Sequence, residues 1–289
     1  MGNYYALAKP GIIFGNIITA LGGFALATRG TGGASGTPID FPLLGAMLIG
    51  LSLVIASGSV FNNYFERRTD ALMERTKDRA LVVGRISPRA ALAYAATLGA
   101  LGFFILTVYV NIIAAAVALV GFFFYVVMYT LLFKHRSSWG TLIGAVAGAV
   151  PPVVGYAAAA NQLDAAAIIL FAILALWQMP HFYAIGIYRR DEYAAAAIPI
   201  LPVTAGLRAT KIVMLIYIAA FAAAAATLSN YAAVGNVYRA VVIVLSAAWL
   251  ALSLRGFWAR DDRRWARTMF FLSLVILIVL FATIALDAA

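Results

Sequence analysis

The chain has 289 residues, of which 64% are apolar and only 11% are charged, and its formal net charge is +10. Soluble domains are roughly 45–50% apolar and about 25% charged, so this composition excludes a water-soluble globule. The absence of cysteine excludes disulfides, thiolate metal sites and iron–sulfur clusters. Of the two histidines, His135 lies in a basic loop, which argues against a transmembrane cytochrome with histidine ligands on facing helices.

Nine apolar runs are long enough to cross a bilayer, which takes about 20 mostly apolar residues per helix. The runs lack the ten-residue alternating segments of a membrane β-barrel, so the sequence predicts an all-α integral membrane protein with nine transmembrane helices. The expected spans are 11–28, 42–65, 90–108, 111–133, 140–160, 165–188, 209–229, 237–255 and 267–286. A glycine-rich loop at 29–40 joins the first two spans, and Val110-Asn111 divides the third from the fourth. Pro151-Pro152 should kink or interrupt the fifth span.

The lysines and arginines set the expected orientation, because the cytoplasmic loops of membrane proteins are enriched in both residues. With the N-terminus inside, all of the 21 lysines and arginines except Arg29 and Arg239 fall on the inner side. We therefore expect a cytoplasmic N-terminus. The same asymmetry accounts for most of the net charge, so we expect no nucleic-acid partner.

The inner end of the second span carries acidic residues that topology does not require. Asn62, Glu66 and Asp70 are spaced by four, so on a helix they form one stripe that drifts by roughly 40° per step. Continuing the stripe to Glu74 and Asp78 would carry it halfway round the helix, so we expect these two residues to lie in a separate loop or turn. Amide and carboxylate oxygens suit Mg²⁺, whereas zinc and copper favour imidazole and thiolate ligands.

Basic residues follow the stripe directly, at Arg75, Lys77 and Arg79. Their side chains can donate charge-assisted hydrogen bonds to phosphate oxygens. An acidic stripe beside a basic cluster is the combination that a metal-bridged diphosphate requires. The alternative is a juxtamembrane helix whose acids simply pair with neighbouring arginines, and spacing alone leaves both interpretations open.

A second polar segment, 177–183, lies near the inner end of the sixth span and is followed by a charged stretch at 188–193. On a continuous helix, Tyr188 and Glu192 would each fall within about 20° of His181. A buried histidine beside aromatic residues is commonly a structural residue, and that interpretation stays open. Because both polar segments cap long helices on the same membrane face, we expect them to share a site.

The polar segments resemble those of the UbiA superfamily of intramembrane prenyltransferases, and the resemblance covers nearly the whole chain. The matching segments are 9–16, 62–70, 73–79, Lys134, 140–144, 151–152, 177–183 and 198–203. The Trp-Gln-x-Pro-His segment at 177–181 is the most specific, because it separates members that farnesylate haem from members that prenylate quinone precursors. The chain departs from the superfamily at Glu66, where Asp is usual. It also has His181 and Ile185 where quinone-type members carry a second Asp-x-x-x-Asp motif.

The resemblance implies a single intramembrane prenyltransferase domain over residues 1–289, in a prokaryotic inner membrane, with its active site facing the cytoplasm. It implies transfer of the farnesyl group of farnesyl diphosphate to the 2-vinyl group of protohaem IX, with addition of water, giving haem O and diphosphate. Mg²⁺ is the implied cofactor, the lipid bilayer is the implied surrounding, and haem A synthase is a candidate partner.

The resemblance also implies roles for individual residues. The expected metal ligands are Asn62, Glu66 and Asp70, which are also expected to be catalytic, with Asp191 as a partial substitute for the missing second motif. The expected diphosphate-binding residues are Arg75, Lys77, Arg79 and Lys134. The expected haem-binding residues are Tyr183, Arg189, Arg190 and His181, the last of which is also expected to be catalytic.

Two other functions stay open from the sequence. An aromatic prenyltransferase of the same fold would act on a quinone precursor instead of haem. A haem or lipid transporter would fit helices interrupted at Pro151-Pro152 and Pro180. A transporter site is expected near the bilayer midplane, however, whereas these polar segments lie at the inner face.

Overall fold

The computed structural model describes residues 2–30 and 39–287, and within these ranges the secondary structure is helical, without a β-strand. The elements are α1 (Gly2–Leu7), α2 (Pro10–Gly30), α3 (Phe41–Asp70), α4 (Pro88–Ile105), η1 (Leu106–Val110), α5 (Ile112–Phe123), η2 (Phe124–Phe133), α6 (Gly140–Gly148), α7 (Val150–Ala160), α8 (Ala165–Tyr188), α9 (Arg190–Ala195), α10 (Leu201–Thr204), α11 (Gly206–Leu228), α12 (Asn236–Arg255), η3 (Gly256–Trp258) and α13 (Asp262–Asp287). The glycine-rich loop expected at 29–40 falls mainly on 31–38, which lie outside the described residues.

Nine helical segments of the described chain are long and apolar enough to cross a membrane, which confirms the predicted number. The chain is therefore an integral multi-pass membrane protein. Its longest helix, α3, has 30 residues, which corresponds to about 45 Å at 1.5 Å per residue. The hydrocarbon core of a bilayer is only about 30 Å thick. The last turns of α3, which carry Glu66 and Asp70, are thus long enough to extend past the hydrocarbon.

Asn111 ends the third span and starts the fourth, at the predicted division. Its side chain accepts a hydrogen bond from the Ala114 amide at 2.8 Å, which caps α5, and donates to the carbonyls of Ala157 and Ala158 on α7. Both spans finish in π-helical turns, η1 and η2, in which amides bond to the carbonyl five residues earlier. Apolar composition does not predict these turns, because they change the hydrogen-bond register without changing hydropathy.

The fifth span is interrupted, as its proline pair predicts. α6 gives way to α7 at Ala149, and Pro151-Pro152 occupies the first turn of α7. A proline costs no intrahelical hydrogen bond there, because the first amides of a helix have no partner within it. Pro180 behaves differently, since α8 continues through it without a break.

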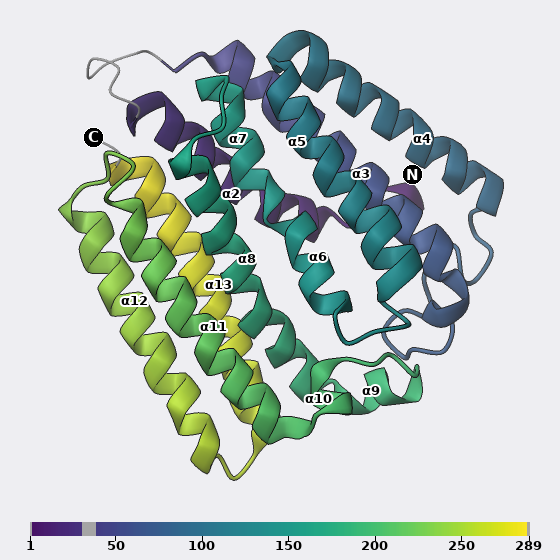
Figure 1. Cartoon of the computed structure of the whole chain (residues 1–289). Coiled ribbons are helices and arrows are strands. Elements are labelled where there is room, and N and C mark those ends of the chain that lie inside the picture. The colour runs from purple at the N-terminus through teal and green to yellow at the C-terminus, as the bar shows by residue number, and fades with distance from the viewer. Residues whose placement is uncertain (1, 31–38, 288–289) are drawn as a thin grey trace.

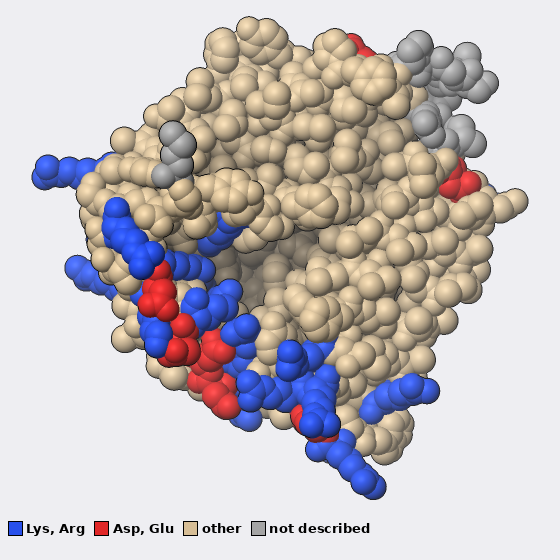
Figure 2. Space-filling view, turned by 180° about the vertical axis from the view of Figure 1, so that it is seen from behind, with Lys and Arg blue, Asp and Glu red and all other residues tan. Residues whose placement is uncertain are grey.

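The spans divide into an inner and an outer set (Figure 1). The inner set lines a central cavity and comprises α2, α3, α5 with η2, α6 with α7, α8 and α13. The outer set is α4, α11 and α12, whose described residues contribute nothing to the lining. α4 packs against α3, whereas α11 packs against α8 and α12 packs against α11 and α13. Figure 2 shows a hollow on one side of the molecule, with lysine and arginine side chains gathered around one end of it.

The segment after α3 folds back towards the end of that helix. α3 ends at Asp70, so the predicted change from helix to turns at this residue is confirmed. Thr76 Oγ1 donates to the Asp70 carbonyl at 2.8 Å. Further along, Leu81 and Ile86 are buried in an apolar cluster with Leu7 of α1. The segment is therefore anchored at both ends, and its basic residues lie beside the last turn of α3.

Two glycines let α2 and α7 approach until their backbones touch. A Cβ atom at Gly23 would lie 1.9 Å from the Pro152 carbonyl oxygen, and one at Gly155 would lie 2.0 Å from the Ala20 carbonyl oxygen. Neither obstacle is a flexible side-chain end, so the helices would have to separate to admit a side chain. This contact fixes two walls of the cavity relative to each other.

We expect Gly155→Val to destabilise the folded protein by about 1–3 kcal/mol or more, because the added carbons overpack a backbone contact. The unfolding temperature in detergent, followed by circular dichroism, measures the effect. Gly45→Ala in α3 is the matched control, since nothing lies within 4 Å of a Cβ atom there. An equal or smaller loss in Gly155→Val than in Gly45→Ala would contradict the assigned contact.

Candidate active site

A single cavity of about 680 Å³ contains both polar segments found in the sequence. The carboxylate stripe of α3 lies at one end, and the segment from Trp177 to Tyr183 of α8 lines another wall. Between them the lining is largely apolar, with side chains such as Leu51, Val54 and Leu277. One cavity therefore joins a charged end to an apolar and aromatic interior.

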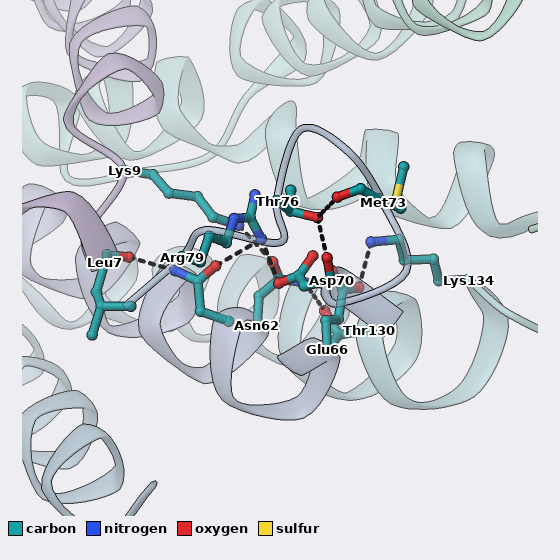
Figure 3. Close-up of polar contacts among 11 residues, drawn as sticks. Leu7, Lys9, Asn62, Glu66, Asp70, Met73, Thr76, Arg79, Thr130 and Lys134 are labelled. Atoms are coloured by element: carbon teal, nitrogen blue, oxygen red, sulfur yellow. Dashed lines mark hydrogen bonds and ion pairs between the residues drawn. The ribbon is translucent and has the colours of Figure 1, made fainter. Parts of the chain in front are cut away.

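Asn62, Glu66 and Asp70 lie along one side of α3, and each is at most 5% exposed. Their partners are three cations from other segments (Figure 3). Lys9 Nζ donates to Asn62 Oδ1 at 2.5 Å, Arg79 Nη1 lies 2.6 Å from Asp70 Oδ2, and Lys134 Nζ pairs with Glu66 Oε1. The acids thus pair with cations, but these cations converge from separate segments instead of neighbouring along one helix.

The oxygen donors of the stripe fit Mg²⁺. Each carboxylate uses one oxygen in its ion pair, and neither Glu66 Oε2 nor Asp70 Oδ1 has a hydrogen-bond partner among the described residues. In the same ranges no three His, Cys, Asp or Glu side chains cluster as a metal cage. Mg²⁺ commonly binds through one or two carboxylates together with waters and phosphate oxygens. Two carboxylates and an amide at the mouth of a cavity match that mode.

The charged end of the cavity is cation-rich. Lys9, Arg75, Arg79 and Lys134 all line it, against the two carboxylates of the stripe. Burial, followed by repulsion from Arg79, lowers the pKa of Lys9 to about 7. An incoming anion would favour the charged form of Lys9, so this end suits a multiply charged phosphate group.

Neighbouring amides and hydroxyls hold the site in place. Asn62 Nδ2 donates to Thr130 Oγ1 at 3.1 Å, which connects the stripe to η2. The adjacent Asn63 donates to the Leu7 carbonyl and accepts from Arg79 Nη1, both at 2.9 Å. The site is therefore bound to the N-terminal segment on one side and to the π-helical turns on the other.

The wall formed by α8 is aromatic. His181 stacks on Trp177 with ring centroids 4.8 Å apart and lies 4.9 Å from the ring of Phe270 on α13. His181 Nδ1 lies 2.7 Å from Ser273 Oγ, and Trp177 Nε1 donates to the Ser273 carbonyl at 2.8 Å. Gln178 donates to the Ala145 carbonyl at 3.1 Å. A flat apolar ligand could lie against this wall without displacing the polar end.

The structure brings some predicted site residues together and leaves others outside. The predicted residues that line the cavity are Asn62, Glu66, Asp70, Arg75, Arg79, Lys134, His181 and Tyr183. Lys77 is not among them, because its loop turns it towards Glu74, to which it pairs at 2.6 Å with its side chain 46% exposed.

Among the described residues of the charged stretch at 188–193, Tyr193 lines the cavity and the others do not. The helix ends at Tyr188 and Glu192 belongs to the separate helix α9, so the continuous helix on which Glu192 would share a face with His181 and Tyr188 does not form. Arg189 pairs with Glu192 at 2.8 Å. Arg190 and Asp191 are exposed, and neither they nor Arg189 line the cavity. The metal and haem roles predicted for these three residues have no geometric support here.

Several residues in or beside the cavity had no predicted site role. Lys9 had a signal, since it is a lysine beside the proline that opens the first span. Tyr125 and Tyr129 of η2 line the cavity, and their spacing of four residues in an apolar span was a weaker signal. Ser273, which contacts His181 without lining the cavity, gave no signal, because a single serine in a transmembrane helix is unremarkable without its partners.

Comparisons with known proteins agree on one family. The sequence pattern of the family described as the UbiA prenyltransferase family matches residues 16–275. A relative from Cronobacter sakazakii named protoheme IX farnesyltransferase is 47% identical over 284 residues, which cover 98% of this chain and 94% of that protein.

Solved structures share the fold. A structure described as digeranylgeranylglyceryl phosphate synthase superposes with a TM-score of 0.81 at 16% identity, covering 99% of this chain and 98% of that one. A UbiA homolog from Archaeoglobus fulgidus bound to DMAPP and Mg²⁺ gives a TM-score of 0.65 at 16% identity, covering 98% and 99%. At these identities the likeness shows the arrangement of helices alone.

The two basic residues Arg75 and Lys77 lie in one loop but differ in position, so they test the cavity assignment. Arg75→Ala should weaken the binding of inorganic diphosphate with Mg²⁺ by about 10-fold, the effect of losing one hydrogen bond to a charged group. Lys77→Ala removes the same charge outside the cavity and should leave affinity unchanged. Isothermal titration of the purified protein measures both. Equal losses would show that net charge alone, and not the cavity lining, governs binding.

Proposed function

The chain belongs to the UbiA prenyltransferase family, and from this premise we propose that it transfers the farnesyl group of farnesyl diphosphate to the 2-vinyl group of protohaem IX. Water adds in the same reaction, and the products are haem O and diphosphate. The observation that carries the proposal is one cavity with a cation-rich carboxylate end and an aromatic wall centred on His181. The naming of the 47%-identical relative supports the choice of haem as acceptor.

At the charged end, the residues of this chain stabilise the leaving group. Lys9, Arg75, Arg79 and Lys134 donate to phosphate oxygens as the carbon–oxygen bond to the farnesyl group breaks. Mg²⁺ held by Asn62, Glu66 and Asp70 would neutralise charge that develops on the departing diphosphate. The cations that pair with the stripe line the same end of the cavity, so they are placed to bind the phosphates that enter it.

The interior shields the allylic cation that ionisation creates. Side chains such as Leu51, Val54 and Phe122 surround the path from the charged end and exclude water. The terminal vinyl carbon of protohaem then attacks, which forms the new carbon–carbon bond and leaves a cation beside the porphyrin ring. A water molecule adds to this carbon and loses a proton, which completes the hydroxyethylfarnesyl group.

The acceptor lies, in this proposal, against the wall formed by Trp177, His181 and Phe270. His181 ligates the haem iron or orients the porphyrin, and Tyr183 lies on the same helix facing the cavity. Arg189 and Arg190 lie outside the cavity, so the proposal does not use them for the propionates.

We also propose an orientation and a setting. The cation-rich end faces the cytoplasm with the N-terminus inside, because that end gathers the lysines and arginines (Figure 2). The setting is a prokaryotic inner membrane, and residues 1–289 act as one intramembrane domain. Haem A synthase is the proposed recipient of the product.

The first test is the mass of the product. Expression in a host that lacks its own haem O should convert protohaem to a species heavier by one hydroxyethylfarnesyl modification, detected by mass spectrometry of extracted haem. Supplying a 4-hydroxybenzoate-type acceptor beside protohaem distinguishes the quinone-type alternative. Prenylation of that acceptor with unmodified haem would refute the proposed acceptor, and transport of haem without diphosphate release would refute the proposed reaction.

The second test concerns the stripe. Glu66→Gln keeps the size of the side chain but removes a charge, and we expect turnover to fall by about 100-fold or more because the leaving group loses its electrostatic support. Diphosphate release in detergent measures this, and chelation of divalent ions should abolish it in the wild type. Asp261→Asn is the control, since that acid is exposed and pairs with Arg264 at 3.2 Å, outside the cavity. Unchanged turnover in Glu66→Gln, or no effect of chelation, would exclude the metal-assisted route.

A further inference from the structure

We infer that Ser273 of α13 is a positioning residue that fixes the tautomer of His181 and leaves its Nε2 lone pair free to coordinate the iron of bound protohaem. The inference rests on the proposed function, since it takes protohaem as the acceptor. It assigns a role to Ser273, a residue of the last span whose side chain contacts His181.

The tautomer follows from counting protons around one hydroxyl group. Ser273 Oγ lies 2.6 Å from the Phe270 carbonyl oxygen and 2.7 Å from His181 Nδ1. A carbonyl oxygen can only accept, so the single hydroxyl proton of Ser273 goes to Phe270. The hydroxyl oxygen then accepts from His181, which must carry its proton on Nδ1. A neutral imidazole has one N–H group, so Nε2 holds a lone pair.

Nε2 of His181 remains available on the cavity side. The residue lines the cavity, and Nε2 makes no hydrogen bond with any described residue. Nε2 is not one of the fully buried polar atoms of the described residues that lack a hydrogen-bond partner, so it retains accessible surface. Neutral imidazole with one free nitrogen is the form that binds a metal.

The same residue of α13 also fixes the plane of the ring. Trp177 Nε1 donates to the Ser273 carbonyl at 2.8 Å, and the Trp177 ring stacks on His181 at an interplanar angle of 22°. Phe270 covers the imidazole from α13, with ring centroids 4.9 Å apart. Through its hydroxyl and its carbonyl, Ser273 therefore holds two side chains that lie one turn apart on α8.

The hydrogen bond between Ser273 and His181 is of the kind that supports a metal-binding histidine. A ligating histidine usually donates its other ring N–H to an oxygen acceptor, which orients the ring and raises its basicity. The Ser273 hydroxyl supplies that acceptor, and its own proton is taken by a backbone carbonyl. The other histidine of the chain, His135, lies outside the cavity lining, so His181 is the one imidazole that can serve the iron there.

The test is the absorption spectrum of purified protein titrated with ferric protohaem and, separately, with iron-free protoporphyrin IX. Ser273→Ala should shift the Soret band and weaken protohaem affinity by about 10-fold or more, the usual effect of removing a hydrogen-bond partner from a metal ligand. Affinity for the iron-free porphyrin should stay unchanged, which also shows that the variant is folded. Ser273→Thr, which keeps the hydroxyl, should restore the wild-type spectrum, and His181→Ala should lose the coordinated spectrum altogether.

Ser253→Ala provides the matched control, since Ser253 is a fully buried serine of α12 that lies outside the cavity and whose hydroxyl has no hydrogen-bond partner among the described residues. It should change neither spectrum nor affinity. An unchanged protohaem spectrum in Ser273→Ala, or an equal loss of affinity for both porphyrins, would overturn the inference and indicate a packing role.

The product assay separates this inference from the proposed function. If the wild type farnesylates protohaem while Ser273→Ala keeps the wild-type spectrum, the inference fails and the function stands. If the wild type neither binds nor farnesylates protohaem, the acceptor itself is wrong and the inference fails with it.

Discussion

The structure depends on keeping two carboxylates buried at the mouth of a membrane cavity. An unpaired charge in such a place costs several kcal/mol, so Glu66 and Asp70 require cations close at hand. The partners come from different parts of the chain, Lys134 after η2 and Arg79 from the loop after α3, while Lys9 holds the neighbouring amide. Three connecting segments, which carry Lys9, Arg79 and Lys134, therefore lie together over the C-terminal end of α3. The same cations are then in place to meet a phosphate group.

Because the paired charges are confined to one end of the cavity, the binding of a phosphate group and the shielding of a carbocation can take place in different parts of it. In the proposed reaction, the charged end binds the diphosphate leaving group, and the apolar stretch beyond it shields the allylic cation from water. The aromatic wall on α8 lies on the apolar side, where stacking and a neutral imidazole replace ion pairs. Within the described part of the chain, six spans supply most of this lining together with the loops on the charged side, and the three outer spans pack against them.

Much of the fold follows from local rules that the sequence displays. The nine spans, the helix end at Asp70, the division at Asn111 and the break before Pro151-Pro152 each reflect hydropathy, spacing or a missing amide. The path of a polar loop has no such local rule, so Lys77 and Arg75 looked equivalent although only Arg75 lines the cavity. Hydropathy also did not show that α8 ends at Tyr188, which separates Glu192 from the helix face of His181. Partners of a lone serine such as Ser273 are invisible until two distant helices are placed side by side.

The π-helical turns of η2 determine how this span responds to the loss of one residue. Their amides reach back five residues, as the Lys134 amide does to the Tyr129 carbonyl at 2.9 Å. Loss of one residue there would allow an ordinary α-helix and would still leave enough apolar chain to cross the bilayer. Each π-turn holds one residue more than an α-turn, so the chain after the lost residue would keep about the same facing, and Lys134 would still lie beside Glu66. A sequence alignment that forbids a gap within this span would therefore shift the lysine out of register, whereas a gap placed at η2 keeps it matched to its carboxylate.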